Sequence, residues 1–383
     1  MHTGVIAPLF RSNKMLKIKQ RKTHKKKIDK KFPNQKIDLK FSRAGVATML
    51  YSGQSTYRSS SPATDSLKIF NKKIEIISKR STNAENPLRA HNSTFLKQIV
   101  KAICLYYIVE KHPNQLREIK ITQMMGSDVV GSNTILKSDL RQVLTRSTDL
   151  AILGNIVPAK AAILLNESIV GRAVLNAATH LIKSLDSSSP FDRFEKLWRA
   201  FNALYKAFAK KSTDQECHVE LRKHIEKYPG IFPLSIAKVS PLSVANIRPM
   251  IRFNQMILNN HPTQRRTEAL KDSIERNKDT RILEIYLASL PVREKFLKND
   301  GLYAATLLYI VNGIQAKVTR DSDVLSILCI KYMYFVRNKM AHAEKADHGF
   351  SFLHGGAEEL EIRWLTPILE ALVIDLINIS DTF

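Results

Sequence analysis

An arginine, an asparagine and a histidine lie close together near the C-terminal end of the chain. They are Arg337, Asn338 and His342, in the run VRNKMAH that spans residues 336–342. An imidazole titrates near neutral pH and can transfer protons as a general base or a general acid. A guanidinium binds phosphate through paired hydrogen bonds and stabilises developing charge. Arg337 and His342 are therefore the candidate catalytic pair for chemistry at a phosphate, and Asn338 would orient one of them.

The spacing of this pair is weak evidence by itself. The chain has 23 Arg and 11 His among its 383 residues, which predicts about 0.7 such pairs by chance. Positions five apart on a straight helix also lie roughly 140° apart around the axis. Arg337 and His342 can therefore converge only if His342 lies where the helix ends or tightens.

The segment that carries the motif is expected to be a central helix over residues 322–342. Its side chains are apolar nearly all round from Val324 to Val336, which is typical of a buried helix. The chemistry then changes abruptly at Arg337. A charge on a buried helix needs a counterion or a solvent-facing cleft, and the polar residues that cluster here favour a cleft.

A structural interpretation of the same residues stays open. Arg337 would then pair with a nearby acid such as Glu359 or Glu361, and His342 would only end a helix. A structural pair would lie buried against acids, whereas a catalytic pair would face an open, basic cleft near Asn202.

A second helix is expected over residues 190–211, with Ser189 as its N-cap and a proline in its first turn. Aromatic side chains recur along it at steps of three and four, namely Phe191, Phe194, Trp198, Phe201, Tyr205 and Phe208. Such a stripe predicts bundle core. Asn202 interrupts the stripe between Trp198 and Tyr205, where an amide without a partner would be costly. A specific partner, structural or catalytic, is expected for it.

Helical patterns cover most of the chain after residue 159. Besides the two helices above, they span residues 159–185, 215–227, 241–259, 265–277, 280–298, 302–317 and 364–379. Pro249 and Pro291 fall inside two of these segments and are expected to kink or break them, whereas Pro367 is expected in the first turn of the last. The expected fold is mainly α, a helical bundle.

Two segments carry a family resemblance. Residues 334–342 resemble the R-x(4-6)-H signature of the HEPN superfamily, in which a polar residue such as Asn338 often follows the arginine. Residues 197–205 are similar to the LW-x-AFNALY helix of one HEPN branch and precede the motif, as in that branch. The resemblance covers roughly residues 159–383.

The resemblance implies a metal-independent endoribonuclease without a cofactor. Members commonly form homodimers that bring two motifs into one cleft, and they often act as toxins or antiviral defence effectors, so an antitoxin or another regulator is a further expected partner. His342 would act on a ribose 2′-OH or on the leaving oxygen, and Arg337 would hold the scissile phosphate. Attack by the 2′-OH would leave a 2′,3′-cyclic phosphate and a 5′-OH.

The sequence departs from the family pattern beside the histidine. Members often carry a bulky aromatic residue and glycine there, whereas Ala341 and Ala343 flank His342. The toxin branch that is silenced by nucleotide transfer has a tyrosine two residues after the histidine, where this chain has Glu344. That mode of control is therefore unsupported. The alternative function is a non-catalytic RNA-binding or dimeric assembly module.

Positive charge is concentrated at the N-terminus. The formal net charge is +25, and the first 82 residues account for about +16 of it. The expected organisation is a basic disordered arm with a Ser-rich linker over residues 1–64, a small α+β region of unknown role over 65–150 and the HEPN-like helical domain over 159–383. We expect the arm to capture RNA.

Three widely separated cysteines, Cys104, Cys217 and Cys329, form no CxxC motif or Cys/His pattern at metal-ligand spacing. Neither a disulfide framework nor a metal site is expected. No run of 18 uninterrupted apolar residues occurs, so we expect no membrane partner and a cytoplasmic location.

Overall fold

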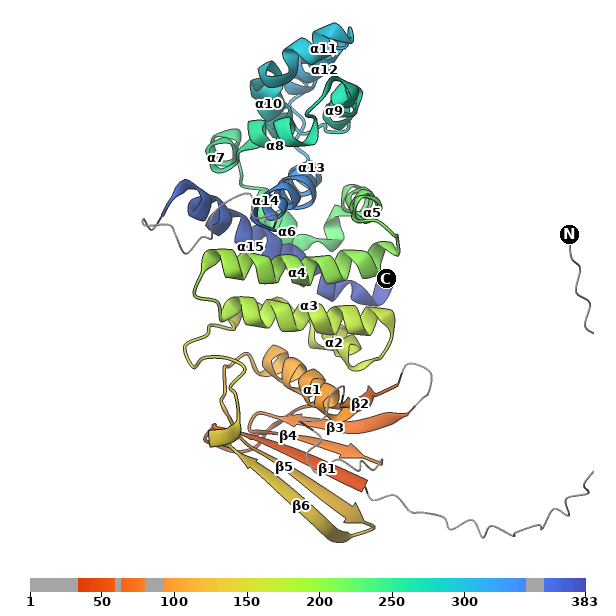
Figure 1. Ribbon diagram of the computed structural model, residues 1–383, viewed down its shortest axis with the longest axis vertical. Coiled ribbons are helices and arrows are strands. Elements are labelled where there is room, and N and C mark those ends of the chain that lie inside the picture. Colours follow the sequence, from red (N-terminus) through yellow and green to blue (C-terminus); the bar gives the residue numbers. More distant parts are fainter. Residues whose placement is uncertain (1–33, 59–62, 80–87, 89–92, 342–354) are drawn as a thin grey trace, which may run out of the picture.

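A computed structural model describes residues 34–58, 63–79, 88, 93–341 and 355–383 of the chain. The described part is mainly helical, with an antiparallel sheet at its N-terminal end (Figure 1). This confirms the expected mainly-α class. Among the described helices, none is by itself long and apolar enough to cross a membrane.

The N-terminal region is a six-stranded sheet in the order β2-β3-β4-β1-β5-β6. Its elements are β1 (Asn34–Phe41), β2 (Met49–Thr56), β3 (Thr64–Phe70), β4 (Lys73–Ser78), α1 (Thr94–Glu110), β5 (Leu116–Met125) and β6 (Asp128–Leu136). The apolar residues Ile37, Leu39 and Phe41 alternate along β1 and are buried, because α1 covers that face (Figure 1). The expected α+β region is present.

The expected boundary at residue 64 is wrong. Strands β1 and β2 lie within residues 34–56, which were assigned to the arm and linker, and β1 is a central strand of the sheet. Lysines and an aspartate alternate with the apolar residues of β1. Because of these charged residues, a strand with one buried face was assigned to the basic arm. The Lys-rich residues 11–33 lie outside the described part of the chain.

The helical region follows the predicted segments closely. Its helices are α2 (Pro158–Ala161), α3 (Ile169–Leu185), α4 (Pro190–Ala209), α5 (Asp214–Lys227), α6 (Pro233–Val239), α7 (Val244–Ile247), α8 (Phe253–Asn260), α9 (Thr267–Glu275), α10 (Thr280–Ser289), α11 (Glu294–Asn299), α12 (Tyr303–Gln315), α13 (Asp321–Ser326), α14 (Met333–Ala341) and α15 (Ala357–Asn378). The expected breaks occur in short 3-10 turns at Pro249 and Pro291.

Two details of the helix ends differ from expectation. Helix α15 begins at Ala357, so Pro367 lies inside it rather than in its first turn. Ser189 is the N-cap of α4 as predicted, but its side chain makes no capping hydrogen bond. Helix α4 packs against α3 and α15, and its aromatic side chains Phe194, Trp198 and Phe201 are buried, which confirms their core role (Figure 1).

A buried polar network joins the sheet region to the helices. The ammonium of Lys101 on α1 forms an ion pair with a carboxylate oxygen of Glu167 at 2.6 Å and donates hydrogen bonds to the backbone oxygens of Thr56 and Leu165. Lys101 is only 1% exposed, so these three partners replace the water that burial removes. The network ties together the end of β2, helix α1 and the turn before α3.

Candidate functional site

The candidate site lies at the end of a buried helical rod that runs from α13 into α14 (Figure 1). Between them, Ile327–Tyr332 forms a π-helical turn. Apolar side chains surround this rod on all sides, and Leu325, Leu328 and Val336 are almost fully buried. The predicted central helix is therefore present, but it contains a π-helical turn that the sequence pattern did not predict. Such turns are rare and frequently occur near functional sites.

Arg337 and Asn338 contact each other near the end of α14. The Nη1 atom of Arg337 donates a hydrogen bond to Oδ1 of Asn338 at 3.2 Å. Both side chains are half-buried. Within the described residues, Arg337 forms no ion pair with a carboxylate. The guanidinium therefore has donors to offer to another anion.

Both acids that were considered as counterions for Arg337 are engaged with other cations. Glu361 accepts from Nη2 of Arg252 at 2.6 Å and from the hydroxyl of Tyr332. Glu359 accepts from Nη2 of Arg363 at 2.6 Å. Within the described residues, neither Glu359 nor Glu361 thus pairs with Arg337, whereas the other part of the structural interpretation, that His342 only ends a helix, concerns a residue outside the description.

His342 lies outside the described residues, as do the flanking residues Ala343 and Glu344. Helix α14 is described up to Ala341. The convergence of Arg337 with His342 thus stays a prediction.

Asn202 and Arg337 lie in opposite directions from a shared aromatic contact. The rings of Trp198 on α4 and Tyr334 on α14 are 6.1 Å apart, and Phe191 lines the same crevice as Met340. Asn202 follows Trp198 by about one helical turn on α4, on the side away from Phe191, whereas Arg337 follows Tyr334 on α14, on the side toward Met340.

The buried Oδ1 atom of Asn202 has no hydrogen-bond partner among the described residues. Such an acceptor is costly unless a partner satisfies it. The structure thus brings Asn338 to Arg337, but within the described residues neither of them bonds to Asn202. The supporting role of Asn202 stays a prediction.

A histidine that the motif search missed is buried near this contact. His218 on α5 packs edge-on against Tyr205, with ring centroids 4.6 Å apart, and against Tyr334 at 5.1 Å. Burial lowers the pKa of His218 to about 4. An imidazole held neutral by aromatic neighbours is a packing residue. Its only signal in the sequence was its place beside the apolar positions Cys217 and Leu221.

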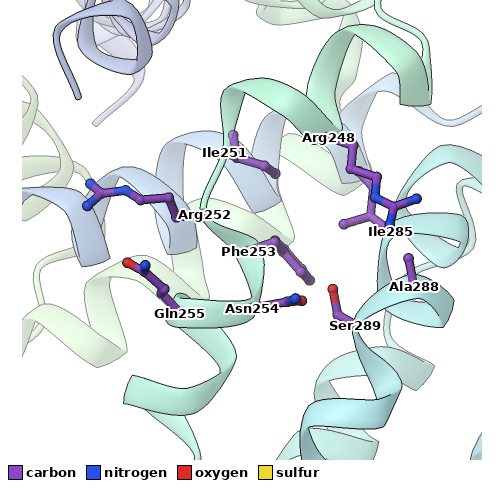
Figure 2. A pocket seen from close by; sticks show the side chains of 9 residues that line it. All are labelled: Arg248, Ile251, Arg252, Phe253, Asn254, Gln255, Ile285, Ala288 and Ser289. Carbon is purple, nitrogen blue, oxygen red and sulfur yellow. The ribbon is translucent and has the colours of Figure 1, made fainter. Parts of the chain in front are cut away.

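A small pocket lies beside the rod, on the side of α8 and α10. Figure 2 shows Arg248, Asn254 and Ser289 around it, and the pocket has a volume of about 240 Å³. Arg252 lines this pocket and also a narrow crevice along α14 that contains Val336. Arg337 lines neither of these two spaces, whereas Val336, Lys339 and Met340 of the same segment line the crevice.

Glu361 is expected to be a structural support of this site. Replacing it with alanine would leave the buried hydroxyl of Tyr332 and the guanidinium of Arg252 without their shared acceptor. We expect Glu361→Ala to lower the free energy of unfolding by about 2 kcal/mol, measured by urea denaturation. The control is Glu195→Ala, which removes an exposed partner of Arg199 and should change stability by less than about 0.5 kcal/mol. Equal effects would contradict the role of Glu361.

Comparison with known proteins identifies no relative of this chain. No family model matches the sequence, and no curated protein or solved structure shows a significant match.

Proposed function

We propose that the chain is a metal-independent endoribonuclease of the HEPN type that cleaves RNA by attack of a ribose 2′-OH. The observation that carries the proposal is that Arg337 has no carboxylate partner among the described residues. Its guanidinium is half-buried beside Asn338 near the end of a central helix, and the two acids considered as its counterions, Glu361 and Glu359, are bound to Arg252 and Arg363. Keeping a guanidinium unneutralised in such a place suits it to bind an incoming anion.

In the proposed reaction, the 2′ oxygen forms a bond to phosphorus while the bond to the 5′ oxygen breaks. His342 takes the proton from the 2′-OH or supplies one to the leaving oxygen. Arg337 holds the non-bridging oxygens, where negative charge grows in the transition state. The hydrogen bond from Arg337 to Asn338 limits the orientations of the guanidinium. The products are a 2′,3′-cyclic phosphate and a 5′-OH.

Cleavage of a labelled RNA in the presence of EDTA tests this function. We expect the wild-type chain to cut the RNA and to leave 2′,3′-cyclic phosphate ends, identified by mass spectrometry. The same RNA with 2′-O-methyl groups should stay intact, because the nucleophile is blocked. His342→Ala should lower cleavage by at least about a hundredfold. RNA that is bound but uncut by the wild-type chain would instead establish the alternative, a non-catalytic RNA-binding or assembly module.

The proposal includes a homodimer, since HEPN motifs commonly act in pairs within one cleft. Light scattering coupled to size-exclusion chromatography measures the mass in solution, where a dimer is expected. A role as a toxin or antiviral effector belongs to the same proposal. Arrested growth on expression of the wild-type chain, relieved by His342→Ala, would support that role.

A further inference from the structure

A basic pocket opens at one end of the sheet, far from the candidate cleavage motif. Lys40 near the end of β1 pairs in register with Lys73 at the start of β4 and with Glu118 on β5. Glu118 in turn pairs with Leu136, the last residue of β6. Antiparallel pairing therefore gathers the ends of four strands around one cavity, with a volume of about 650 Å³. That is within the size range of ligand pockets.

Cations dominate the lining of this pocket. Lys40, Lys72, Lys73, Arg117 and Lys137 face a single acid, Glu118. Lys40 pairs with Glu118 at 2.7 Å, and Lys73 pairs with Glu75 at 2.5 Å. The other three cations form no ion pair with any residue in the described part of the chain. The pocket thus has about three uncompensated positive charges.

Exposed lysines are usually only solvated, so concavity is the feature that distinguishes this set. Phe41 also lines the pocket, and its ring is buried and stacked on Tyr106 with centroids 4.1 Å apart. Several cations around one concavity add their fields and concentrate anions there. Lysine provides point charges for phosphate, and arginine adds a two-pronged donor.

We propose that this pocket binds phosphate groups of the RNA strand, at a docking site separate from the site of cleavage. The proposal rests on the proposed ribonuclease function, which makes RNA the expected polyanion. Helices α1, α3 and α4 lie between the sheet and α14 (Figure 1). The pocket therefore holds a part of the strand away from the scissile bond and affects binding rather than chemistry.

The test is binding of a fluorescein-labelled 2′-O-methyl RNA of about 20 nucleotides, longer than typical single-strand sites, to the full chain. The 2′-O-methyl groups prevent cleavage, so binding is measured whether or not the chain is a nuclease. The pocket variant carries Lys72→Glu, Arg117→Glu and Lys137→Glu. Its control carries Lys211→Glu, Lys238→Glu and Lys295→Glu, which are exposed lysines elsewhere and change the net charge equally.

Fluorescence anisotropy should show binding at least tenfold weaker for the pocket variant. The slope of log affinity against log salt should become shallower by about 2, because three phosphate contacts each contribute about 0.7 on a single strand. The control should lose clearly less affinity. Circular dichroism and melting curves establish that both variants are folded.

Equal losses in the two variants would overturn the proposal, because overall charge alone would then explain binding. Displacement of the RNA by low millimolar inorganic phosphate or uridine monophosphate would also overturn it, since the pocket would then be a site for a free phosphate compound. Pocket-dependent binding without cleavage would retain the pocket and remove the nuclease function. Cleavage of RNA by the wild-type chain, together with equal binding losses in the two variants, would retain the nuclease function and remove the pocket.

Discussion

Replacing Arg337 with alanine is expected to lower the rate of RNA cleavage about a thousandfold, with little effect on RNA binding. The guanidinium is half-buried and carries no carboxylate partner among the described residues, so its donors are available to the phosphate. Loss of one donor that faces developing negative charge typically reduces kcat by about 10² to 10³. Single-turnover cleavage of labelled RNA in EDTA measures the effect.

The control for this substitution is Arg265→Ala. Arg265 is an exposed arginine just before α9 that forms no ion pair within the described residues, so its loss removes the same charge and releases no acid. We expect that variant to cleave RNA within about twofold of wild type. Arg337→Lys should recover only part of the activity, because an ammonium cannot make paired hydrogen bonds to phosphate. Wild-type rates in Arg337→Ala would remove this residue from the mechanism.

The second large effect concerns Lys331 in the π-turn and the dependence of stability on pH. Its ammonium contacts the hydroxyl of Ser273, which bonds to the hydroxyl of Tyr286 at 3.0 Å. Burial, with Arg276 and Arg222 nearby, lowers the pKa of Lys331 to about 7. Lys331 therefore loses much of its charge in the folded protein near neutral pH but keeps it in the unfolded chain.

The direction of the effect follows from proton binding. Between about pH 7 and pH 10 the unfolded chain binds more protons at Lys331 than the folded protein does, so stability rises with pH in this window. The contribution of this one group is of the order of 3 kcal/mol across the window, since each pH unit adds up to about 1.4 kcal/mol. Below pH 7 the folded protein must hold a buried charge, and that contribution is absent.

We expect Lys331→Met to abolish this rise and to make the protein more stable than wild type at pH 6. Methionine fills similar space without a charge, and Ser273 keeps Tyr286 as its partner. Urea denaturation at pH 6, 7, 8 and 9 measures the effect. Lys295→Met, at an exposed site, is the control and should follow the wild-type curve. Parallel curves for wild type and Lys331→Met would show that Lys331 is ordinarily solvated.

Local patterns were sufficient for most of the helices. The aromatic stripe of α4 and the apolar run before Arg337 predicted two buried helices, because helical periodicity is a property of short stretches of chain. Pro249 and Pro291 marked two breaks for the same local reason. Strand β1 was missed because alternating lysines made a half-buried strand resemble a charged arm.

The sequence by itself determined the mainly helical class, whereas the hydrogen bond from Arg337 to its neighbour Asn338 is seen only in the structure. Tertiary structure decided which acids meet which cations. From the sequence, Glu361 was a candidate counterion for Arg337. In the structure it instead pairs with Arg252, which is 109 residues from Glu361 along the chain. Tertiary structure also decided that strand ends distant in the sequence surround one basic pocket. Such contacts depend on how helices and strands pack across long separations, and no local spacing of residue types encodes that packing.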